Sequence, residues 1–292
     1  MAATSENPSL TSRSPTPFPA TSPPTSPVLP GAPGAPAVSV VMPAYNEAAI
    51  LGATVRDVVD GLRARGVCFE VLVVENGSTD GTPAIAARAA AAVPEVEAIT
   101  LRRPDYGEAM RAGLLAARHD VAVIFDVDYY DLAFLDTALA RLGTPAPGRP
   151  ALVVGSKRAP GARDERPWAR RVATAAFSTL LRRGFRLSVS DTHGMKVLDL
   201  GVLRPVIRQC RHGADLFDTE LVLRAERAGL AVVEIPVAVQ ERRPSRTPLW
   251  RRVPRTLRGL ARLRLRVGAV GVGRASQAAA GAAGSAGGDA AG

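Results

Sequence analysis

Short apolar runs rich in β-branched residues alternate with longer segments of helical periodicity, and this alternation constrains the fold more than any other feature. The runs predict strands at residues 38–42, 69–74, 96–101, 121–125 and 151–154. The segments between them predict helices at residues 48–65, 82–92, 107–118 and 132–142. Such an alternation is typical of a parallel sheet covered by helices on both faces. We therefore expect one α/β domain with a Rossmann-like, mostly parallel central sheet.

The two ends of the chain differ from this middle part in composition. Residues 1–37 are rich in Pro, Ser, Thr and Ala and predict a disordered lead, and residues 267–292, nearly all Ala and Gly, predict a disordered tail. The α/β domain is expected at residues 38–245, followed by a basic amphipathic helical segment at residues 246–266. We find no secretory signal and no apolar stretch long enough to span a bilayer.

The spacing of the cysteines and the distribution of charge indicate which classes of protein the chain can belong to. Cys68 and Cys210 lie far apart without metal-ligand spacing, which predicts reduced thiols in a cytoplasmic protein. The net charge of +10 is carried almost wholly by arginine, mainly in the C-terminal half. A non-enzymatic, arginine-rich nucleic-acid binder is a remote alternative, because few aromatic residues are interleaved with the basic ones.

Two acids, Asp126 and Asp128, follow the apolar run at residues 121–125. In an extended chain this spacing directs both carboxylates to the same side. A pair of carboxylates suits Mg²⁺ or Mn²⁺, which keeps waters and recruits substrate phosphates as further ligands. The alternative is a pair of solvated acids that opens the turn at residues 129–131.

Polar residues also follow the first two predicted strands. Pro43-Ala-Tyr-Asn-Glu47 comes after the first and Glu75-Asn-Gly-Ser-Thr-Asp80 after the second. Ligands of such sheets bind outside the carboxyl ends of the strands. We expect residues 78–80 to be mostly structural, as turn and cap, and Glu75 to lie in a solvent-facing loop.

The sequence lacks the motifs of several other enzyme classes. It has no dinucleotide fingerprint and no phosphate loop of the ATPase type. It has no serine on a nucleophile elbow to complete a hydrolase triad. A sugar nucleotidyltransferase would carry a Gly-rich basic loop where this chain has Pro43-Ala-Tyr-Asn-Glu47.

The three motifs together resemble the family 2 glycosyltransferases, which have the GT-A fold. The resemblance implies transfer of a sugar from a nucleotide-diphosphate donor with inversion at the anomeric carbon. It implies that Asp126 and Asp128 hold Mg²⁺ or Mn²⁺. The residues that it implies for nucleotide-sugar binding are Pro43, Ala44, Tyr45, Asn46, Glu47, Glu75 and Asp126.

Four later stretches look like the branch of that family that transfers hexoses to dolichyl or other polyprenyl phosphates. They are Val154-Gly-Ser-Lys-Arg158, Ser190-Asp-Thr-His-Gly-Met-Lys196, Phe217-Asp-Thr-Glu-Leu-Val-Leu-Arg224 and Arg242-Arg-Pro-Ser-Arg246. The likeness implies that the acceptor phosphate is held by Lys157, Arg158, Arg243 and Arg246.

The chain departs from the pattern of this branch in three places, so the donor stays open between the GDP-mannose and UDP-glucose types. Glu75-Asn76 replaces an Asp-Asp pair, Tyr130 replaces a glutamine, and His193-Gly-Met replaces a Gln-Cys-Gly-Phe stretch.

The acceptor determines whether a general base is needed. An alcohol must lose a proton as it attacks, whereas a phosphate monoester, with a second pKa of about 6, already carries an oxyanion. For a soluble alcohol acceptor, the alternative to a polyprenyl phosphate, the base candidates are Asp191, Asp218 and Glu220. Their structural alternatives are a helix cap for Asp218 and a salt link to Arg224 for Glu220.

Residues 247–266 combine apolar residues spaced by three or four with many arginines and no acid. This pattern predicts a helix at the membrane surface, and the alternative is a helix packed on the domain with solvated arginines. With a polyprenyl phosphate acceptor, we expect peripheral contact with the inner, cytoplasmic face of the cell membrane.

Overall fold

The computed structural model describes most of the middle of the chain. The described residues are 37–143, 149–164, 168–185, 187–211, 213, 216–239 and 258–264. The expected lead (apart from Ala37), the expected tail, and the acceptor candidates Arg243 and Arg246 lie outside them.

The described strands form a seven-stranded sheet in the order β3-β2-β1-β4-β7-β5-β8. They are β1 (Val38–Ala44), β2 (Phe69–Asn76), β3 (Val96–Leu101), β4 (Val121–Ile124), β5 (Leu152–Ser156), β7 (Lys196–Asp199) and β8 (Val232–Pro236). Beside them, β6 (Arg163–Asp164) and β9 (Ala238–Val239) form a two-stranded sheet. The expected strands are all present, with ends displaced by a few residues.

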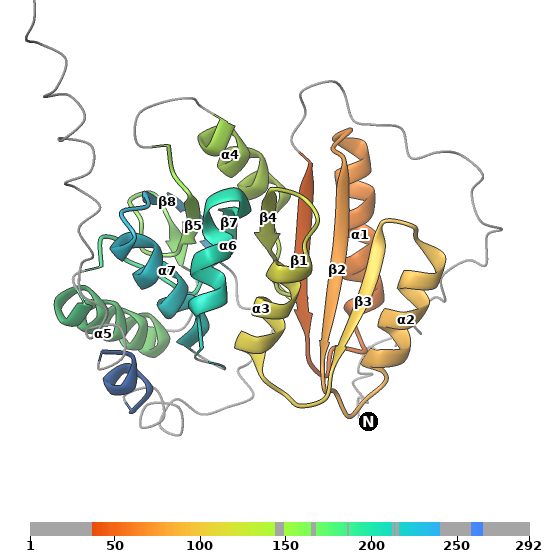
Figure 1. The fold of residues 1–292 in the computed structure, drawn as a ribbon, viewed down its shortest axis with the longest axis horizontal. Coiled ribbons are helices and arrows are strands. Elements are labelled where there is room, and N and C mark those ends of the chain that lie inside the picture. Colours follow the sequence, from red (N-terminus) through yellow and green to blue (C-terminus); the bar gives the residue numbers. More distant parts are fainter. Residues whose placement is uncertain are drawn as a thin grey trace, which may run out of the picture.

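Helices cover both faces of the sheet (Figure 1). They are α1 (Leu51–Ala64), α2 (Thr82–Ala92), α3 (Tyr106–Ala116), α4 (Leu132–Gly143), α5 (Trp168–Phe185), α6 (Leu200–Gln209) and α7 (Phe217–Arg227). The first, second and fourth share a hydrophobic cluster on one face, and the other four contribute to the cluster on the opposite face.

Alternating strand residues supply the two clusters. Val41 and Leu72 join the cluster under α3, whereas their neighbours Val40 and Val71 join the cluster under α1. Strands buried on both faces must be apolar at nearly every position, which explains the continuous apolar runs in the sequence. The expected α/β architecture is therefore confirmed.

One strand departs from the parallel arrangement. β7 lies antiparallel between β4 and β5, and Lys196 at its start pairs with Ile124 on one side and Val154 on the other. The amino end of β7 therefore lies at the same edge as the carboxyl ends of its two neighbours. Residues 190–196 are placed there by this reversal.

The described part of the expected membrane-surface segment, residues 258–264, is helical, but it packs on the domain. Leu260 and Leu263 are buried in the same hydrophobic cluster as α6 and α7 residues, while Arg258 and Arg262 are exposed. These seven residues match the packed-helix alternative, and they carry the core of the domain past residue 245. Among the described helices, none is long and apolar enough to cross a bilayer.

Candidate active site

The loops after β1 and β2 are joined by hydrogen bonds. The Asn46 amide donates to Ser78 Oγ (3.0 Å), and Asn46 Oδ1 accepts from the Thr79 amide (2.8 Å). The Glu47 amide donates to Thr82 Oγ1 (2.8 Å). Asn46 has a φ of 55°, a left-handed conformation that asparagine tolerates better than most residues. The two motifs therefore form one surface at the sheet edge.

Asp80 completes this junction. Its Oδ1 accepts from the Thr82 amide (2.9 Å), and its Oδ2 accepts from the Ala48 amide (3.2 Å). Residues 78–80 thus have the structural role that we expected for them as a turn, but the N-cap of α2 is Gly81, without a side-chain cap hydrogen bond.

Glu75 is buried, with 1% of its surface exposed, so the expected solvent-facing position is wrong. The physical reason is that β2 continues to Asn76, so Glu75 lies inside the sheet between Ala44 of β1 and Thr100 of β3. Its Oε1 accepts from the Ser78 amide at 2.5 Å. The Glu75 carboxylate therefore fixes the loop after β2 through the Ser78 amide.

The other implied donor residues lie at the end of β1. Pro43 and Ala44 are its last residues and are buried, whereas the Tyr45 side chain that follows is 40% exposed. Tyr45 is therefore accessible to a ligand at this edge.

The loop after β3 is tied to the same surface. Asn76 Oδ1 accepts from the Asp105 amide (2.7 Å), and Asp105 Oδ1 accepts from the Glu108 amide (3.1 Å), which caps α3. Gly213 packs so closely against the Asp105 carboxylate that a Cβ there would meet it. These contacts set the position of Tyr106, the first residue of α3.

Asp126 and Asp128 lie in a tight turn rather than in the extended chain that we expected. The Asp126 amide donates to the Tyr129 carbonyl (3.1 Å) and the Tyr129 amide to the Asp126 carbonyl (3.2 Å). The pair of bonds leaves Val127 and Asp128 at the tip, with Val127 buried and Asp128 exposed. Asp126 is half-buried, so the solvated-acid alternative describes Asp128 only.

Negative charge is concentrated around Asp126. Burial raises the pKa of Asp126 to about 6, and the charges of Asp128 and Asp218 raise it further. A hydrogen bond from the Tyr106 hydroxyl (2.7 Å) acts in the opposite direction. Burial also raises the pKa of Tyr106 well above its usual value, with Asp126 adding to the effect.

A buried ion pair lies next to this group of acids. Lys196 Nζ is 2.6 Å from Asp218 Oδ1, and both side chains are almost fully buried. Lys196 also donates to the Gly194 carbonyl (2.7 Å). The helix cap named as the structural alternative for Asp218 is not observed: Asp218 lies in the first turn of α7, where its Oδ1 faces Lys196 of β7.

Lys157 and Asp191 form a second pair near the end of β5. Lys157 Nζ is 3.7 Å from Asp191 Oδ2 and donates to the His193 carbonyl (3.2 Å). Burial opposes ionisation of Asp191, but Lys157 and the His193 amide outweigh it and lower the pKa of Asp191. The Arg158 side chain beside them is exposed.

Glu220 is separated from these groups by its own contacts. It is fully buried, and its carboxylate accepts from Arg224 Nε (2.7 Å) and from the Arg211 amide (2.8 Å). This is the internal salt link named as the alternative to a base. Tyr130 is likewise structural, because its hydroxyl donates to Asp57 of α1 (3.1 Å).

Two residues of the site, Tyr106 and Lys196, received no role from the sequence. Tyr106 follows the third strand, whose carboxyl end lies at the same edge as the motifs, and this position was the available signal. Lys196 could not be placed in the same way, because its position depends on the antiparallel direction of β7.

The Asp126–Asp128 turn fits a divalent cation under one condition. Within the described ranges, no group of three or more His, Cys, Asp and Glu residues is arranged to hold a metal. Two carboxylates therefore suffice only if substrate oxygens and waters complete the shell, as Mg²⁺ and Mn²⁺ readily accept. Burial is the main cause of the raised pKa of Asp126, and a bound cation would compensate the charges of Asp128 and Asp218, which add to it.

Comparison with known proteins identifies the class. The sequence profile described as Glycosyl transferase family 2 matches residues 39–204, more than half of the chain. The protein therefore belongs to this family and is a glycosyltransferase. The sheet, with its mixed but mostly parallel strands, is of the GT-A type that the motifs implied.

Similar sequences carry names from the same class. A glycosyltransferase of Mycobacterium bovis, named as uncharacterized, is 38% identical over 209 residues, covering 69% of this chain and 84% of the relative. A dolichyl-phosphate hexose transferase of Haloferax volcanii is 30% identical over 210 residues, covering 70% and 83%. A polyprenol monophosphomannose synthase of Mycolicibacterium smegmatis is 29% identical over 211 residues, covering 70% and 77%.

A solved structure shares the fold. Glucosyl-3-phosphoglycerate synthase of Mycobacterium tuberculosis, solved with Mn²⁺, uridine diphosphate and glucosyl-3-phosphoglycerate, superposes with a TM-score of 0.59. It is 24% identical, and the match covers 80% of each chain.

Proposed function

We propose that this glycosyltransferase moves a hexose from a nucleotide-diphosphate sugar to a polyprenyl phosphate at a membrane surface, with inversion. The main support for the nucleotide-sugar donor is the continuous surface that the loops after β1, β2 and β3 form beside the Asp126–Asp128 turn. In α/β sheets this edge is where ligands bind. The nucleoside would lie on the Asn46 and Glu75 side and the diphosphate at the turn.

Residues of the turn would hold the metal. Asp126 and Asp128 would bind it, with Tyr106 orienting Asp126 through its hydroxyl. When bound there, Mg²⁺ or Mn²⁺ would neutralise the charge that develops on the departing nucleoside diphosphate.

The state of the remaining carboxylates favours a phosphate acceptor over an alcohol. Asp191 is paired with Lys157 and has a lowered pKa, and Asp218 is paired with Lys196. A carboxylate with a lowered pKa, such as that of Asp191, is a weak proton acceptor, and Asp218 is occupied by its contact with Lys196. A phosphate monoester needs no strong base, only orientation and charge compensation, which Lys157 and Arg158 at the end of β5 would supply.

Names of relatives point to the same acceptor class. The Haloferax volcanii and Mycolicibacterium smegmatis proteins are named for transfer to dolichyl phosphate and for synthesis of polyprenol monophosphomannose. Both matches cover more than three quarters of the relative. The same acceptor chemistry is our proposal for this chain.

A surface for membrane contact is offered by α5 rather than by the buried leucines of residues 258–264. Trp168, Val172 and Leu180 are 75%, 58% and 43% exposed, and their spacing of four and eight residues places them on one side of the helix. Exposed arginines on the same helix are Arg171, Arg182 and Arg183. Exposed apolar residues beside basic ones suit an anionic lipid surface.

The transfer itself can be tested with labelled UDP-glucose and GDP-mannose against polyprenyl phosphate in vesicles. We expect product with one donor, and none in excess chelator or with Asp128→Ala. Turnover in excess chelator, with donor still bound, would contradict the metal role. Product formed only with a soluble acceptor would favour the second candidate, the same fold acting on a small molecule or saccharide.

Membrane contact needs its own test. Sedimentation with anionic vesicles at low salt should decrease when Trp168, Val172 and Leu180 are together replaced by serine. Val202→Ser on α6 is the matched control, because Val202 is similarly exposed (45%) on another helix. Equal sedimentation of both variants would remove α5 from the proposal.

A further inference from the structure

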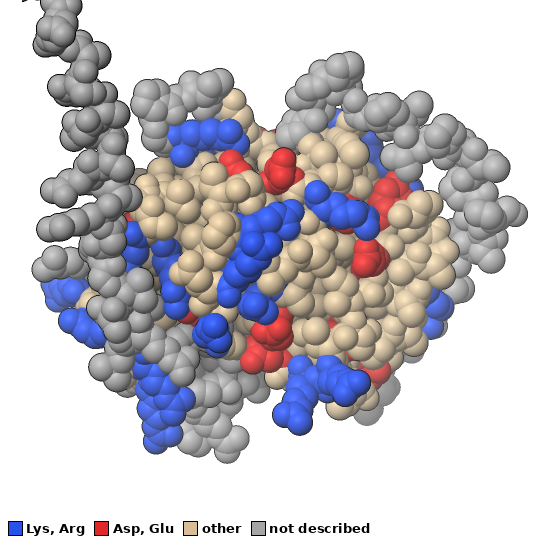
Figure 2. Space-filling model, in the orientation of Figure 1, with Lys and Arg blue, Asp and Glu red and all other residues tan. Residues whose placement is uncertain are grey.

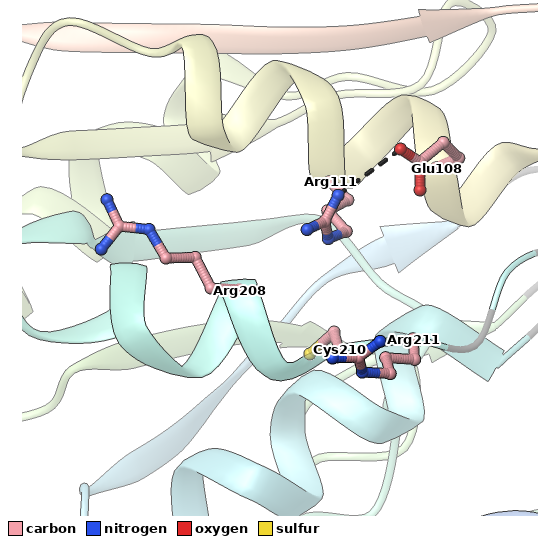
Figure 3. Close-up of a pocket in the computed structure, with 5 residues that line it drawn as sticks. All are labelled: Glu108, Arg111, Arg208, Cys210 and Arg211. Carbon is pink, nitrogen blue, oxygen red and sulfur yellow. Dashed lines mark hydrogen bonds and ion pairs between the residues drawn. The ribbon is translucent and has the colours of Figure 1, made fainter.

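A pocket lies between α3 and α6, and none of the residues that line it is assigned to donor or acceptor (Figure 3). Its volume is about 550 Å³, within the usual range for small-molecule sites. The residues that line it are Glu108, Arg111, Arg208, Cys210 and Arg211.

The arginines reach the pocket from separate elements. Arg111 projects from α3 toward α6, Arg208 projects from α6, and Arg211 follows α6 in the chain (Figure 3). On α3, the neighbouring residues Met110 and Gly113 are buried against the sheet, so Arg111 lies on the opposite, outer side. Figure 2 shows the resulting concentration of basic side chains over α3 and α6.

The pocket has more positive than negative charge. Its one carboxylate, Glu108, is 3.5 Å from Arg111, and both side chains are partly exposed, so this pair is weak. Within the part of the chain that the structure describes, the side chains of Arg208 and Arg211 have no acidic partner. Three guanidinium groups with one carboxylate among them leave the pocket with a net positive charge, which a bound anion would compensate.

The wall of the pocket formed by Cys210 is uncharged, and hydrogen bonds fix its position. Burial raises the pKa of the Cys210 thiol to about 12, with the charge of Glu220 adding to the effect, so no thiolate opposes an anion. Cys210 Sγ donates to the Val206 carbonyl (3.4 Å). The Arg211 amide donates to Glu220 (2.8 Å), which fixes the backbone beneath the arginines.

We propose that this pocket binds a small phosphate monoester, at a site separate from the nucleotide-sugar site. Guanidinium groups match phosphate oxygens with paired donors, and three of them compensate a dianion. The volume accommodates an organic group besides the phosphate, and its neutral wall is Cys210.

Calorimetric titration of the full chain with glycerol phosphate tests the site. It is done in chelator and at constant ionic strength, so that metal-bridged binding and general salt effects are absent. We expect saturable binding by the parent, at least tenfold weaker binding by Arg208→Gln/Arg211→Gln, and intermediate binding by Arg208→Lys/Arg211→Lys. Arg88→Gln is the control, since it removes an exposed arginine from α2, which packs on the other face of the sheet.

Donor binding separates this proposal from the preceding one. The double glutamine variant should bind nucleotide sugar in the presence of Mn²⁺ as the parent does, which also shows that it is folded. The pocket assignment is overturned by the absence of saturable binding in the parent, or by equal phosphate affinity in the parent and the double glutamine variant. Either result leaves the proposed transfer reaction untouched, since that is measured with donor and polyprenyl phosphate.

Discussion

The Tyr106 hydroxyl donates a 2.7 Å hydrogen bond to Asp126 Oδ1, and this bond links the first residue of α3 to the carboxyl end of β4. It is the contact through which the loop after β3 reaches the acidic turn. Because the acceptor is a carboxylate in a half-buried place, the bond both orients Asp126 and favours its ionised form.

Removing this hydroxyl should shift the pH dependence of metal binding. Asp126 must be ionised to bind a cation, and its pKa is raised to about 6, so binding should be complete above that pH and decrease as pH falls through it. In Tyr106→Phe the pKa of Asp126 should rise further, so the decrease should begin at higher pH. Titration with Mn²⁺ between pH 5 and 8 measures this.

Tyr130→Phe is the control for that experiment, since it also loses a hydroxyl bonded to an aspartate, but on α1. The two variants should differ. Identical pH profiles for the parent and Tyr106→Phe would show that the bond has no influence on the metal site.

Glu75→Gln should weaken nucleotide-sugar binding. If the carboxylate also bonds to the nucleoside, loss of its charge should cost about 1.5–3 kcal/mol of binding free energy. Calorimetry with the donor measures the loss. Glu70→Gln is the matched control, because Glu70 is equally buried on the same strand but at its other end, bonded to Ser39 and Arg118. A similar loss of donor affinity in both variants would assign Glu75 a structural role only.

The Lys196–Asp218 pair should show strong energetic coupling. Lys196→Met leaves Asp218 buried without its cation and should lower the free energy of unfolding by about 3–5 kcal/mol. Lys196→Met/Asp218→Asn removes both charges and should lose clearly less. Urea denaturation in chelator compares them. If the double variant is as unstable as the single one, charge pairing is not what holds these residues together.

Leu263→Ala should destabilise the fold, because Leu263 is fully buried in the cluster shared with α6 and α7. We expect a loss of about 2–5 kcal/mol in the free energy of unfolding, the usual range for Leu→Ala in a core. Leu180→Ala, at an exposed position of α5, should change it by less than about 0.5 kcal/mol. If Leu263→Ala leaves the free energy of unfolding unchanged and weakens vesicle binding, residues 258–264 contact the membrane and not the core.

The sequence alone determined the α/β class, the strand and helix positions as far as residue 154, and the edge of the sheet at which the motifs lie. These depend on local pattern, because a strand buried on both faces must be apolar throughout and an amphipathic helix must repeat every three or four residues. The motif at residues 43–47 and the acids at 126 and 128 follow such strands directly, so their common edge could be predicted.

Tertiary structure alone decided the rest. The antiparallel direction of β7 placed Lys196 beside the acids, and no local pattern encodes the direction in which a short strand enters a sheet. β2 continues inside the sheet and thereby buries Glu75. Leu260 and Leu263 are buried because they pack in the hydrophobic cluster that contains residues of α6 and α7. An apolar stripe beside arginines suits both a membrane and a protein core. Whether a membrane or the protein core covers the stripe depends on contacts with residues distant in the chain. Only the folded structure contains that information.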